Sequence, residues 1–254
     1  MIDIKNAKEV FKEYVKNYNL DDGMIMLKVK HILRVAEISR DIALKNNLNE
    51  EDVNLAELIG LLHDIGRFEQ VKVYNTFKDY ESVNHAKLGV KILFEDGLIR
   101  KFIDEPIYDE IIKTAILNHN KGRIDDTITG KTLDFCKIIR DADKVDIFYV
   151  LLEEEFIDAY GMADMSEELV TDEILREFKE DRIIDYTKRK TGADLVISHI
   201  AYIFDFNYKY CLDKINNEKY IYKLVEKANF KNKDTINKMQ EVLRIAQDYI
   251  ESKE

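Results

Sequence analysis

Helix-breaking residues are scarce in this chain. Its 254 residues include one proline and nine glycines, so few positions interrupt a helix. Apolar residues recur three and four positions apart in almost every segment, which is the period of a helix, and no run of alternating strand pattern is evident. The sequence therefore predicts an all-α protein with long helices.

Helix boundaries follow from this periodicity and from capping residues. The predicted helices cover residues 4–18, 24–45, 51–63, 82–94, 106–119 and 131–159. Gly66 is expected to cap the third helix at its C-terminal end, Ser82 to cap the fourth at its N-terminal end, and Pro106 to open the fifth. Residues 65–83 are predicted to form a long irregular loop, a feature that is often functional in a compact domain.

The remainder of the chain, residues 161–254, is again predicted to be helical and is rich in Tyr, Phe, Lys and Glu. No clean linker precedes it, so we expect one all-α domain over residues 1–254, with residues 161–254 packed as a helical extension on a core of residues 24–160. A chain of this length can bury a large core.

Charge and cysteine content narrow the class of protein. A net charge of -11 argues against binding to a nucleic-acid polymer, which requires clustered cations, but it is compatible with a small phosphorylated substrate. The apolar stretches are too short to span a membrane, and the N-terminus has no apolar segment typical of a secretory signal. The two cysteines, Cys136 and Cys211, do not form a CxxC pair, so we expect a cytoplasmic protein without a disulfide scaffold.

Four of the five histidines are interleaved with aspartates: His31, His63-Asp64, His85 and His119, followed by Asp141 or Asp143. Histidine and aspartate together suit divalent Zn, Mn, Fe, Ni or Co. Six such groups are too many for one closed structural site. They suit two adjacent metals that share a bridging carboxylate and leave positions open for water and substrate.

Helical geometry favours one of the late aspartates as a ligand. Asp143 shares a helix face with Cys136 and Ile139, whereas Asp141, two residues away at about 100° per residue, falls roughly on the opposite side. We therefore expect Asp143 to point inward. Asp146, one turn further along, is an additional candidate.

The segment Leu62-His63-Asp64-Ile65-Gly66-Arg67, with His31 upstream and Ala142-Asp143 downstream, resembles the HD-domain superfamily of metal-dependent phosphohydrolases over about residues 24–160. The resemblance implies an all-helical core in which His31, His63, Asp64 and Asp143 are the basic metal ligands. His85 and His119 look like the additional ligands of dinuclear members, in which the aspartate of the HD pair bridges two metals. Expected cofactors are thus two divalent ions, such as Mn, Fe, Ni, Co, Zn or Mg.

A metal pair lowers the pKa of a bridging water, so that hydroxide is available near neutral pH to attack phosphorus. Catalytic roles are therefore expected for Asp64 and for Arg67, whose guanidinium suits bidentate contact with phosphate. The alternative for Arg67 is a surface arginine beside a helix cap. Further substrate contacts are predicted from the two loops that follow the ligands, with a solvated loop residue as the alternative for each. These residues are Gln70, Lys72, Tyr74, Lys121 and Arg123.

The leading hypothesis is a metal-dependent phosphohydrolase acting on a small phosphorylated substrate such as a nucleotide. Two alternatives remain open: a di-iron oxygenase, because some members of the superfamily use the same ligand set for oxidation, and a non-catalytic nucleotide-binding regulator. His199, on an apolar helix, is interpreted as a core histidine. The aromatic stripe Tyr202–Tyr210 is interpreted as core packing or as the surface of a homodimer, and the oligomeric state is left open.

Overall fold

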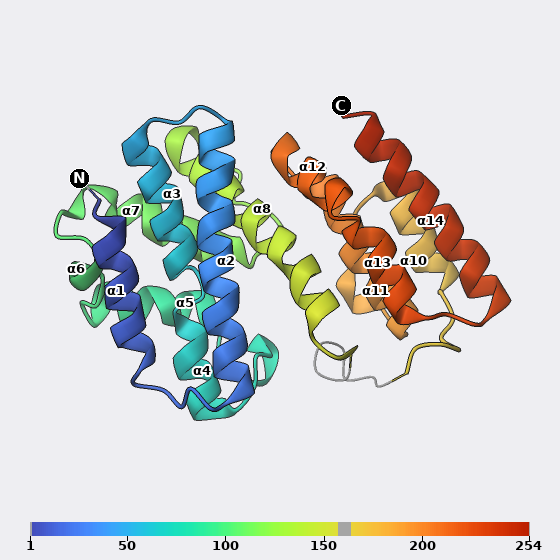
Figure 1. The fold of residues 1–254 in the computed structure, drawn as a ribbon, viewed down its shortest axis with the longest axis horizontal. Coiled ribbons are helices and arrows are strands. Elements are labelled where there is room, and N and C mark those ends of the chain that lie inside the picture. Colours follow the sequence, from blue (N-terminus) through green and yellow to red (C-terminus); the bar gives the residue numbers. More distant parts are fainter. Residues whose placement is uncertain (1, 157–163, 254) are drawn as a thin grey trace. The chain divides into compact units, whose positions relative to one another are not determined.

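Helices make up all the regular structure of the residues described, 2–156 and 164–253 of a computed structural model (Figure 1). No strand occurs in those two ranges, which confirms the predicted all-α class. None of the helices within them combines the length and apolarity needed to cross a membrane.

The chain divides into two compact units, Met1–Asp143 and Lys144–Glu254. The first unit contains α1 Ile4–Val15, α2 Gly23–Lys45, α3 Glu50–Leu62, α4 Gly66–Tyr74, α5 His85–Val90, α6 Ile99–Phe102, α7 Asp109–His119 and the start of α8 Gly130–Glu153. The second contains the end of α8 and α10 Asp172–Arg176, α11 Gly192–Ile200, α12 Lys209–Asn217, α13 Tyr220–Ala228 and α14 Lys233–Glu251. The interpretation of the whole chain as a single domain stays a prediction.

The central helix of the first unit is α3. Its residues from Leu55 to Leu62 are all buried, as expected for a helix that is apolar on every side. It packs along α2 (Figure 1). A Cβ at Gly60 of α3 would lie 2.7 Å from Cα of Ala36 in α2, so glycine permits this close approach of the two backbones. The approach places the C-terminal end of α3 against the side of α2.

The prediction that Gly66 caps a helix is wrong, and so is the predicted loop over residues 66–74. Gly66 instead opens α4, in which Phe68 and Val71 are buried one turn apart. Glycine is required there because a Cβ would lie 2.3 Å from the carbonyl oxygen of His85 in α5. Asn75, in the left-handed conformation with φ 52°, ends α4, which is a helix-ending signal that the sequence does contain.

Other boundaries need smaller corrections. α1 ends at Val15, three residues earlier than predicted. Asn84, and not Ser82, caps α5 by accepting a hydrogen bond from the backbone N–H of Lys87, although His85 does lie in the first turn as expected. Pro106 opens a 3₁₀ turn that leads into α7. α8 ends at Glu153, and the last residues of the helix predicted to reach Ala159 lie outside the described ranges.

The second unit is helical, as predicted for residues 161–254. His199 lies near the end of α11, where its Nδ1 is 2.9 Å from the carbonyl oxygen of Leu195 and its ring packs edge-on against Tyr202. Burial lowers the pKa of His199 to about 4. A neutral, partly buried histidine packed in this way agrees with its interpretation as a structural residue of the second unit.

Candidate metal centre

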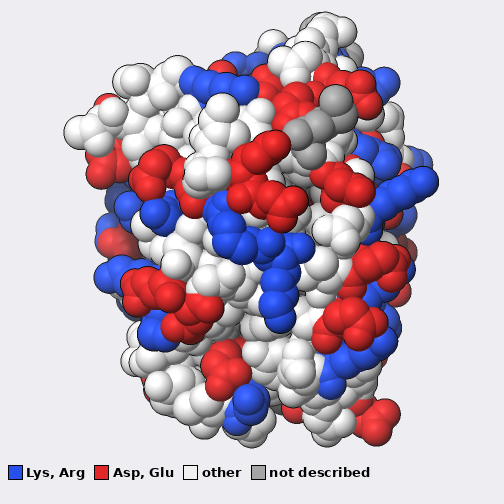
Figure 2. Space-filling model, turned by 90° about the vertical axis from the view of Figure 1, so that its left-hand side faces the viewer, with Lys and Arg blue, Asp and Glu red and all other residues white. Residues whose placement is uncertain are grey.

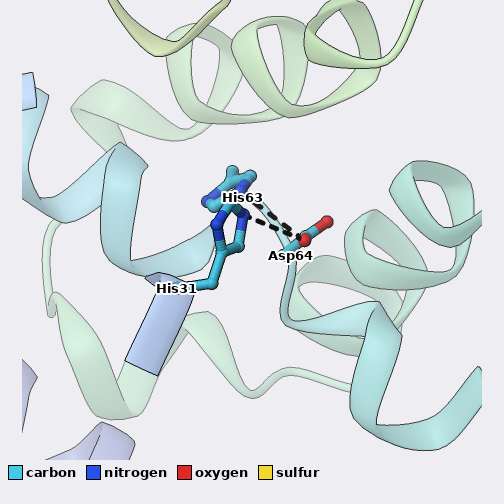
Figure 3. A group of neighbouring side chains, drawn as sticks. All are labelled: His31, His63 and Asp64. Carbon is cyan, nitrogen blue, oxygen red and sulfur yellow. Dashed lines mark ion pairs between the residues drawn. The ribbon is translucent and has the colours of Figure 1, made fainter. Parts of the chain in front are cut away.

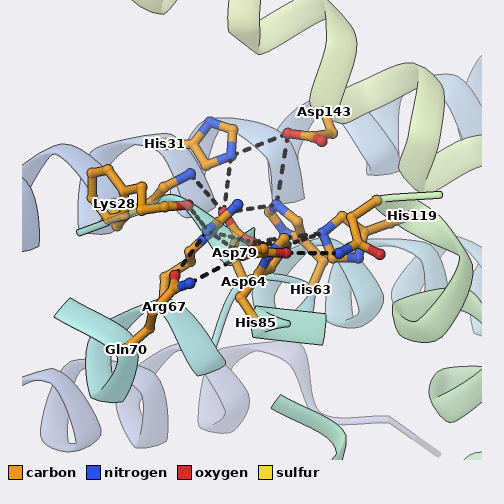
Figure 4. Close-up of polar contacts among 12 residues, drawn as sticks. Lys28, His31, His63, Asp64, Arg67, Gln70, Asp79, His85, His119 and Asp143 are labelled. Atoms are coloured by element: carbon orange, nitrogen blue, oxygen red, sulfur yellow. Dashed lines mark hydrogen bonds and ion pairs between the residues drawn. The ribbon is translucent and has the colours of Figure 1, made fainter. Parts of the chain in front are cut away.

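Six side chains that are far apart in the sequence converge in the first unit (Figure 4). They come from the middle of α2, the turn between α3 and α4, the start of α5, the end of α7 and the part of α8 that precedes the unit boundary. All except Asp143 are buried, and the side chain of Asp143 is 20% exposed. They are the residues predicted as metal ligands: His31, His63, Asp64, His85, His119 and Asp143.

The carboxylate of Asp64 lies between two groups of histidines. Its Oδ2 is 3.6 Å from Nε2 of His31 and 3.7 Å from Nε2 of His63, as Figure 3 shows. Its Oδ1 is 3.2 Å from Nε2 of His85 and 3.6 Å from Nε2 of His119. One carboxylate therefore presents a separate oxygen to each group, which is the arrangement that a bridging ligand requires.

Asp143 completes the group on the Oδ2 side. Its Oδ1 lies 3.2 Å from Nε2 of His31 and 3.8 Å from Nε2 of His63. His31, His63, Asp64 and Asp143 thus form one set of four donors, and Asp64, His85 and His119 form a second set that shares only Asp64.

Hydrogen bonds to the opposite ring nitrogen show which nitrogen of each histidine is available. Nδ1 of His63 lies 2.7 Å from the carbonyl oxygen of Gly60, and Nδ1 of His119 lies 2.6 Å from that of Ile116. A carbonyl oxygen only accepts, so each Nδ1 donates and each neutral ring has its lone pair on Nε2. Nε2 of His63 is buried without a hydrogen-bond partner. These lone pairs point at carboxylate oxygens, an arrangement that a cation between them stabilises.

The second group shows the same pattern. Nδ1 of His85 donates to the carboxylate of Asp79 at 2.8 Å, which leaves the lone pair of the neutral ring on Nε2. That atom lies 3.0 Å from Nε2 of His119, so two lone pairs face each other across a short distance. A divalent ion that accepts both of them relieves this repulsion. The donor set of imidazole nitrogens and carboxylate oxygens thus fits transition-metal ions or zinc.

Burial keeps the histidines in the form that binds metal. Burial lowers the pKa of His63 to about 3, against the opposing effect of the neighbouring Asp64 and Asp143. Burial also lowers the pKa of His85 to about 4, against its hydrogen bond to Asp79. Both rings are therefore neutral near pH 7, as metal ligation requires.

The carboxylates are held in their ionised form. Burial opposes the ionisation of Asp64, but the positive charges of Lys28 and Arg67 favour it, and the pKa of Asp64 is held well below its usual range. Burial likewise opposes the ionisation of Asp143, but its close contact with His31, 3.2 Å between Oδ1 and Nε2, outweighs that effect and lowers the pKa of Asp143. Neutral imidazoles beside ionised carboxylates are the protonation states of a metal site.

Comparison with protein-family models gives a match to the HD domain over residues 29–147, just under half of the chain. Residues 29–147 are named the HD domain below after this match. The match begins just before His31 and ends just after Asp143, so it includes all six converging residues, and it lies within the predicted core of residues 24–160. No curated protein and no solved structure matched the chain.

Two cations of the HD domain lie beside Asp64. Nζ of Lys28 is 2.7 Å from Oδ2 of Asp64, and Nε of Arg67 is 3.5 Å from Oδ1. Both also lie over the ring of Phe77, at 5.3 and 5.7 Å from its centroid. Sequence reasoning singled out Arg67 but missed Lys28. The signal for Lys28 was its position one turn before His31, on the same face of the same helix.

The Arg67 guanidinium makes several hydrogen bonds within the protein. Its Nη1 donates to Oε1 of Gln70 at 2.8 Å, to the carbonyl oxygen of Phe77 at 2.6 Å and to Oδ1 of Asp79 at 3.0 Å. Nη2 makes no hydrogen bond to the described residues. Gln70 is fully buried and donates to Asp79, Ser82 and the carbonyl oxygen of Val83. These hydrogen bonds all join Gln70 to other protein groups, and a contact of Gln70 with substrate stays a prediction.

The other predicted substrate residues lie on exposed parts of the HD domain. Lys72 is exposed and its Nζ is 3.4 Å from Glu69. Tyr74 and Lys121 are also exposed, and the Arg123 side chain is 85% exposed. No hydrogen bond or ion pair of these four joins the six converging residues, and their substrate contacts stay predictions.

Burial does not distinguish the late aspartates of α8 that helix geometry places on different faces. Asp141 is fully buried and Asp146 is 1% exposed, so Asp141 is not on a solvent face. The reason is that α8 is buried on nearly all sides between Ile138 and Asp146, and burial cannot separate the candidates there. The contacts of Asp143 support it instead, because its Oδ1 lies 3.2 Å from Nε2 of His31 and 3.8 Å from Nε2 of His63.

Arg140 of α8 holds the end of α7, where His119 lies. Its buried guanidinium donates to the carbonyl oxygens of Asn118, His119, Lys121 and Gly122. These are carbonyls at and just beyond a helix C-terminus, which have no partners within the helix and favour a cation. We expect Arg140→Met to lower the free energy of unfolding by about 3 kcal/mol, because the substitution leaves buried acceptors unpaired.

Urea unfolding measures this effect. Arg244→Met is the matched control, because the Arg244 side chain is 68% exposed and lies 3.9 Å from Asp248. It should change stability by less than about 0.5 kcal/mol. Equal effects of the two substitutions would contradict the role assigned to Arg140.

Proposed function

We propose that this protein is a metal-dependent phosphohydrolase that cleaves a phosphate ester of a small phosphorylated compound. The observation that carries the proposal is the position of Asp64, with one carboxylate oxygen facing His31 and His63 and the other facing His85 and His119. The HD domain over residues 29–147 supports it.

The residues present fit two divalent ions. His31, His63 and Asp143 with Oδ2 of Asp64 would hold one ion, and His85 and His119 with Oδ1 of Asp64 would hold the other. When bound, such a pair activates water as a nucleophile and neutralises charge on phosphoryl oxygens.

Lys28 and Arg67 supply positive charge next to these positions. Among the described residues, Nζ of Lys28 has one ion pair, with Asp64, and Nη2 of Arg67 makes no hydrogen bond. Both groups therefore retain donors for the oxygens of a substrate phosphate, and the guanidinium favours recognition of phosphate by more than one bond. A dianionic phosphate matches this combination of two cations and metal ions.

The charge of the surface agrees with a small substrate. Figure 2 shows one face of the molecule, on which a small central group of Lys and Arg side chains is bordered by Asp and Glu. A nucleic-acid polymer needs an extended basic band, and the net charge of -11 disfavours one.

Phosphate release from a panel of nucleotides and sugar phosphates, with Mn, Co, Ni or Mg supplied in turn, tests this function. We expect turnover with at least one pair of substrate and metal and none after chelation. Protein with both ions bound that releases no phosphate from any substrate would refute it. Bound iron together with oxygen consumption would instead support the alternative function, a di-iron oxygenase that uses the same ligands.

Lys28 allows a sharper test of phosphate recognition. We expect Lys28→Met to raise the KM for the preferred phosphate ester about tenfold, which corresponds to the loss of about 1.4 kcal/mol of binding, without lowering the metal content. Lys30→Met is the control, because Lys30 is exposed on the same helix and the charge change is identical. An unchanged KM in Lys28→Met would show that Lys28 does not contribute to substrate binding.

A further inference from the structure

Asp79 lies in the segment between α4 and α5, and sequence reasoning did not find it. Its carboxylate accepts hydrogen bonds from His85, Arg67 and Gln70 (Figure 4). It also accepts one from Nδ2 of Asn120, 3.3 Å from Oδ2. Nδ1 of His85 is 2.8 Å from Oδ2, and Nη1 of Arg67 and Nε2 of Gln70 are each 3.0 Å from Oδ1. One carboxylate thus joins a metal-ligand histidine to the arginine beside Asp64.

We propose that Asp79 is a positioning residue that makes His85 a ligand of the second metal and fixes the Arg67 side chain next to it. The proposal rests on the metal centre of the proposed function and extends it to a residue outside the HD pair and the other ligands.

The position of His85 in its helix explains why a side chain is needed. His63 and His119 each donate from Nδ1 to the carbonyl oxygen three residues earlier, at the end of a helix where such carbonyls have no other partner. His85 is the first residue of α5, so no preceding helical turn can supply this carbonyl. Asp79 supplies the acceptor instead. A carboxylate in this place fixes the ring orientation and increases the basicity of the ligating nitrogen.

Charge gives a second reason for a carboxylate at this position. Lys28 and Arg67 already lie beside Asp64, and a second divalent ion adds positive charge to the same region. A carboxylate that contacts both Arg67 and His85 offsets the repulsion between the guanidinium and that ion. A neutral acceptor would orient His85 but would not offset this charge.

Two variants of Asp79 distinguish its role as a hydrogen-bond acceptor from its role as a negative charge. Asp79→Ala removes both the acceptor and the charge, and Asp79→Asn retains an acceptor oxygen and removes only the charge. Glu81→Gln is the matched control, because Glu81 lies in the same 3₁₀ turn, and its ion pair is with Lys78. It removes one negative charge from this turn without touching the site.

The test is Mn²⁺ binding, measured as the number of ions per chain and the affinity of each by calorimetry and elemental analysis. Wild type and Glu81→Gln should bind two ions. Asp79→Ala should bind the more weakly held ion with an affinity about 10- to 100-fold lower than wild type. Its affinity for the more tightly held ion should be unchanged. Asp79→Asn should lose less affinity for the weaker ion than Asp79→Ala does. A general loss of structure would instead weaken the binding of both ions. It would also lower the urea concentration at the midpoint of unfolding in proportion.

Two results would overturn the proposal, and they differ from each other. If Asp79→Ala and Asp79→Asn, shown to be folded by circular dichroism, bind both ions as wild type does, Asp79 is not a positioning residue and the proposed function is unaffected. If wild type itself binds no ion, the metal centre and the role of Asp79 fail together.

Discussion

Asp64→Asn should abolish binding of both metal ions and lower the rate of phosphate release about a thousandfold. Each oxygen of this carboxylate faces its own pair of histidines, so one substitution weakens both positions. The size of the effect follows because metal ions supply several kcal/mol of transition-state stabilisation, and about 4 kcal/mol corresponds to a thousandfold in rate. Elemental analysis and a phosphate-release assay measure the two effects.

Glu57→Gln is the matched control for this substitution. Glu57 is also a buried carboxylate paired with a lysine, at 2.6 Å from Nζ of Lys8, and it lies on α3 before the HD pair. It should retain both ions and full activity. Retention of two tightly bound ions in Asp64→Asn would rule out a bridging role for Asp64.

Gly66→Ala should destabilise the protein by about 3 kcal/mol or more. The added Cβ would lie 2.3 Å from the carbonyl oxygen of His85 and 2.6 Å from the backbone nitrogen of Gly89. Backbone atoms of two packed helices cannot move apart without disrupting their contacts, so overpacking is costly here. The substitution pushes α5 away from α4 and thereby moves His85 away from Asp64, so binding of the second ion should weaken as well. Urea unfolding and Mn²⁺ titration measure these two effects.

Gly23→Ala is the control that distinguishes the steric clash at Gly66 from the general effect of replacing a glycine. Gly23 opens α2 as Gly66 opens α4, and a Cβ at Gly23 would meet no atom within 4 Å. Alanine there should be neutral or stabilising by up to about 1 kcal/mol. If Gly66→Ala unfolds at the same urea concentration as Gly23→Ala, the close packing of α4 against α5 is not as described.

The sequence predicted the helical class, and it singled out His and Asp residues that cluster in the structure, because both features depend on local pattern. The period of apolar residues predicted the helices, and the order of His31, His63, Asp64 and the later histidines predicted the resemblance to the HD domain that the family-model match also gives. Asp143 does contact His31 and His63, but burial alone does not favour it, because α8 is buried on almost all sides there and Asp141 is buried as well.

Features that depend on contacts between distant segments were not predictable. Gly66 looked like a helix cap because the close approach of α5 is invisible in the sequence. Asp79 follows no motif or period, and its role arises only because the segment after α4 folds back to place it against His85 and Arg67. The helix period places Lys28 on the same face as His31, but nothing in the sequence alone pairs Lys28 with Asp64.

The central claim is that Asp64 divides two metal positions between its two oxygens. Anomalous scattering from crystals of the Mn²⁺-loaded protein tests it most directly. We expect two peaks, one among His31, His63 and Asp143 at Oδ2 of Asp64, and one among His85 and His119 at Oδ1. A single peak, or peaks that leave Asp64 outside the coordination of either ion, would contradict it.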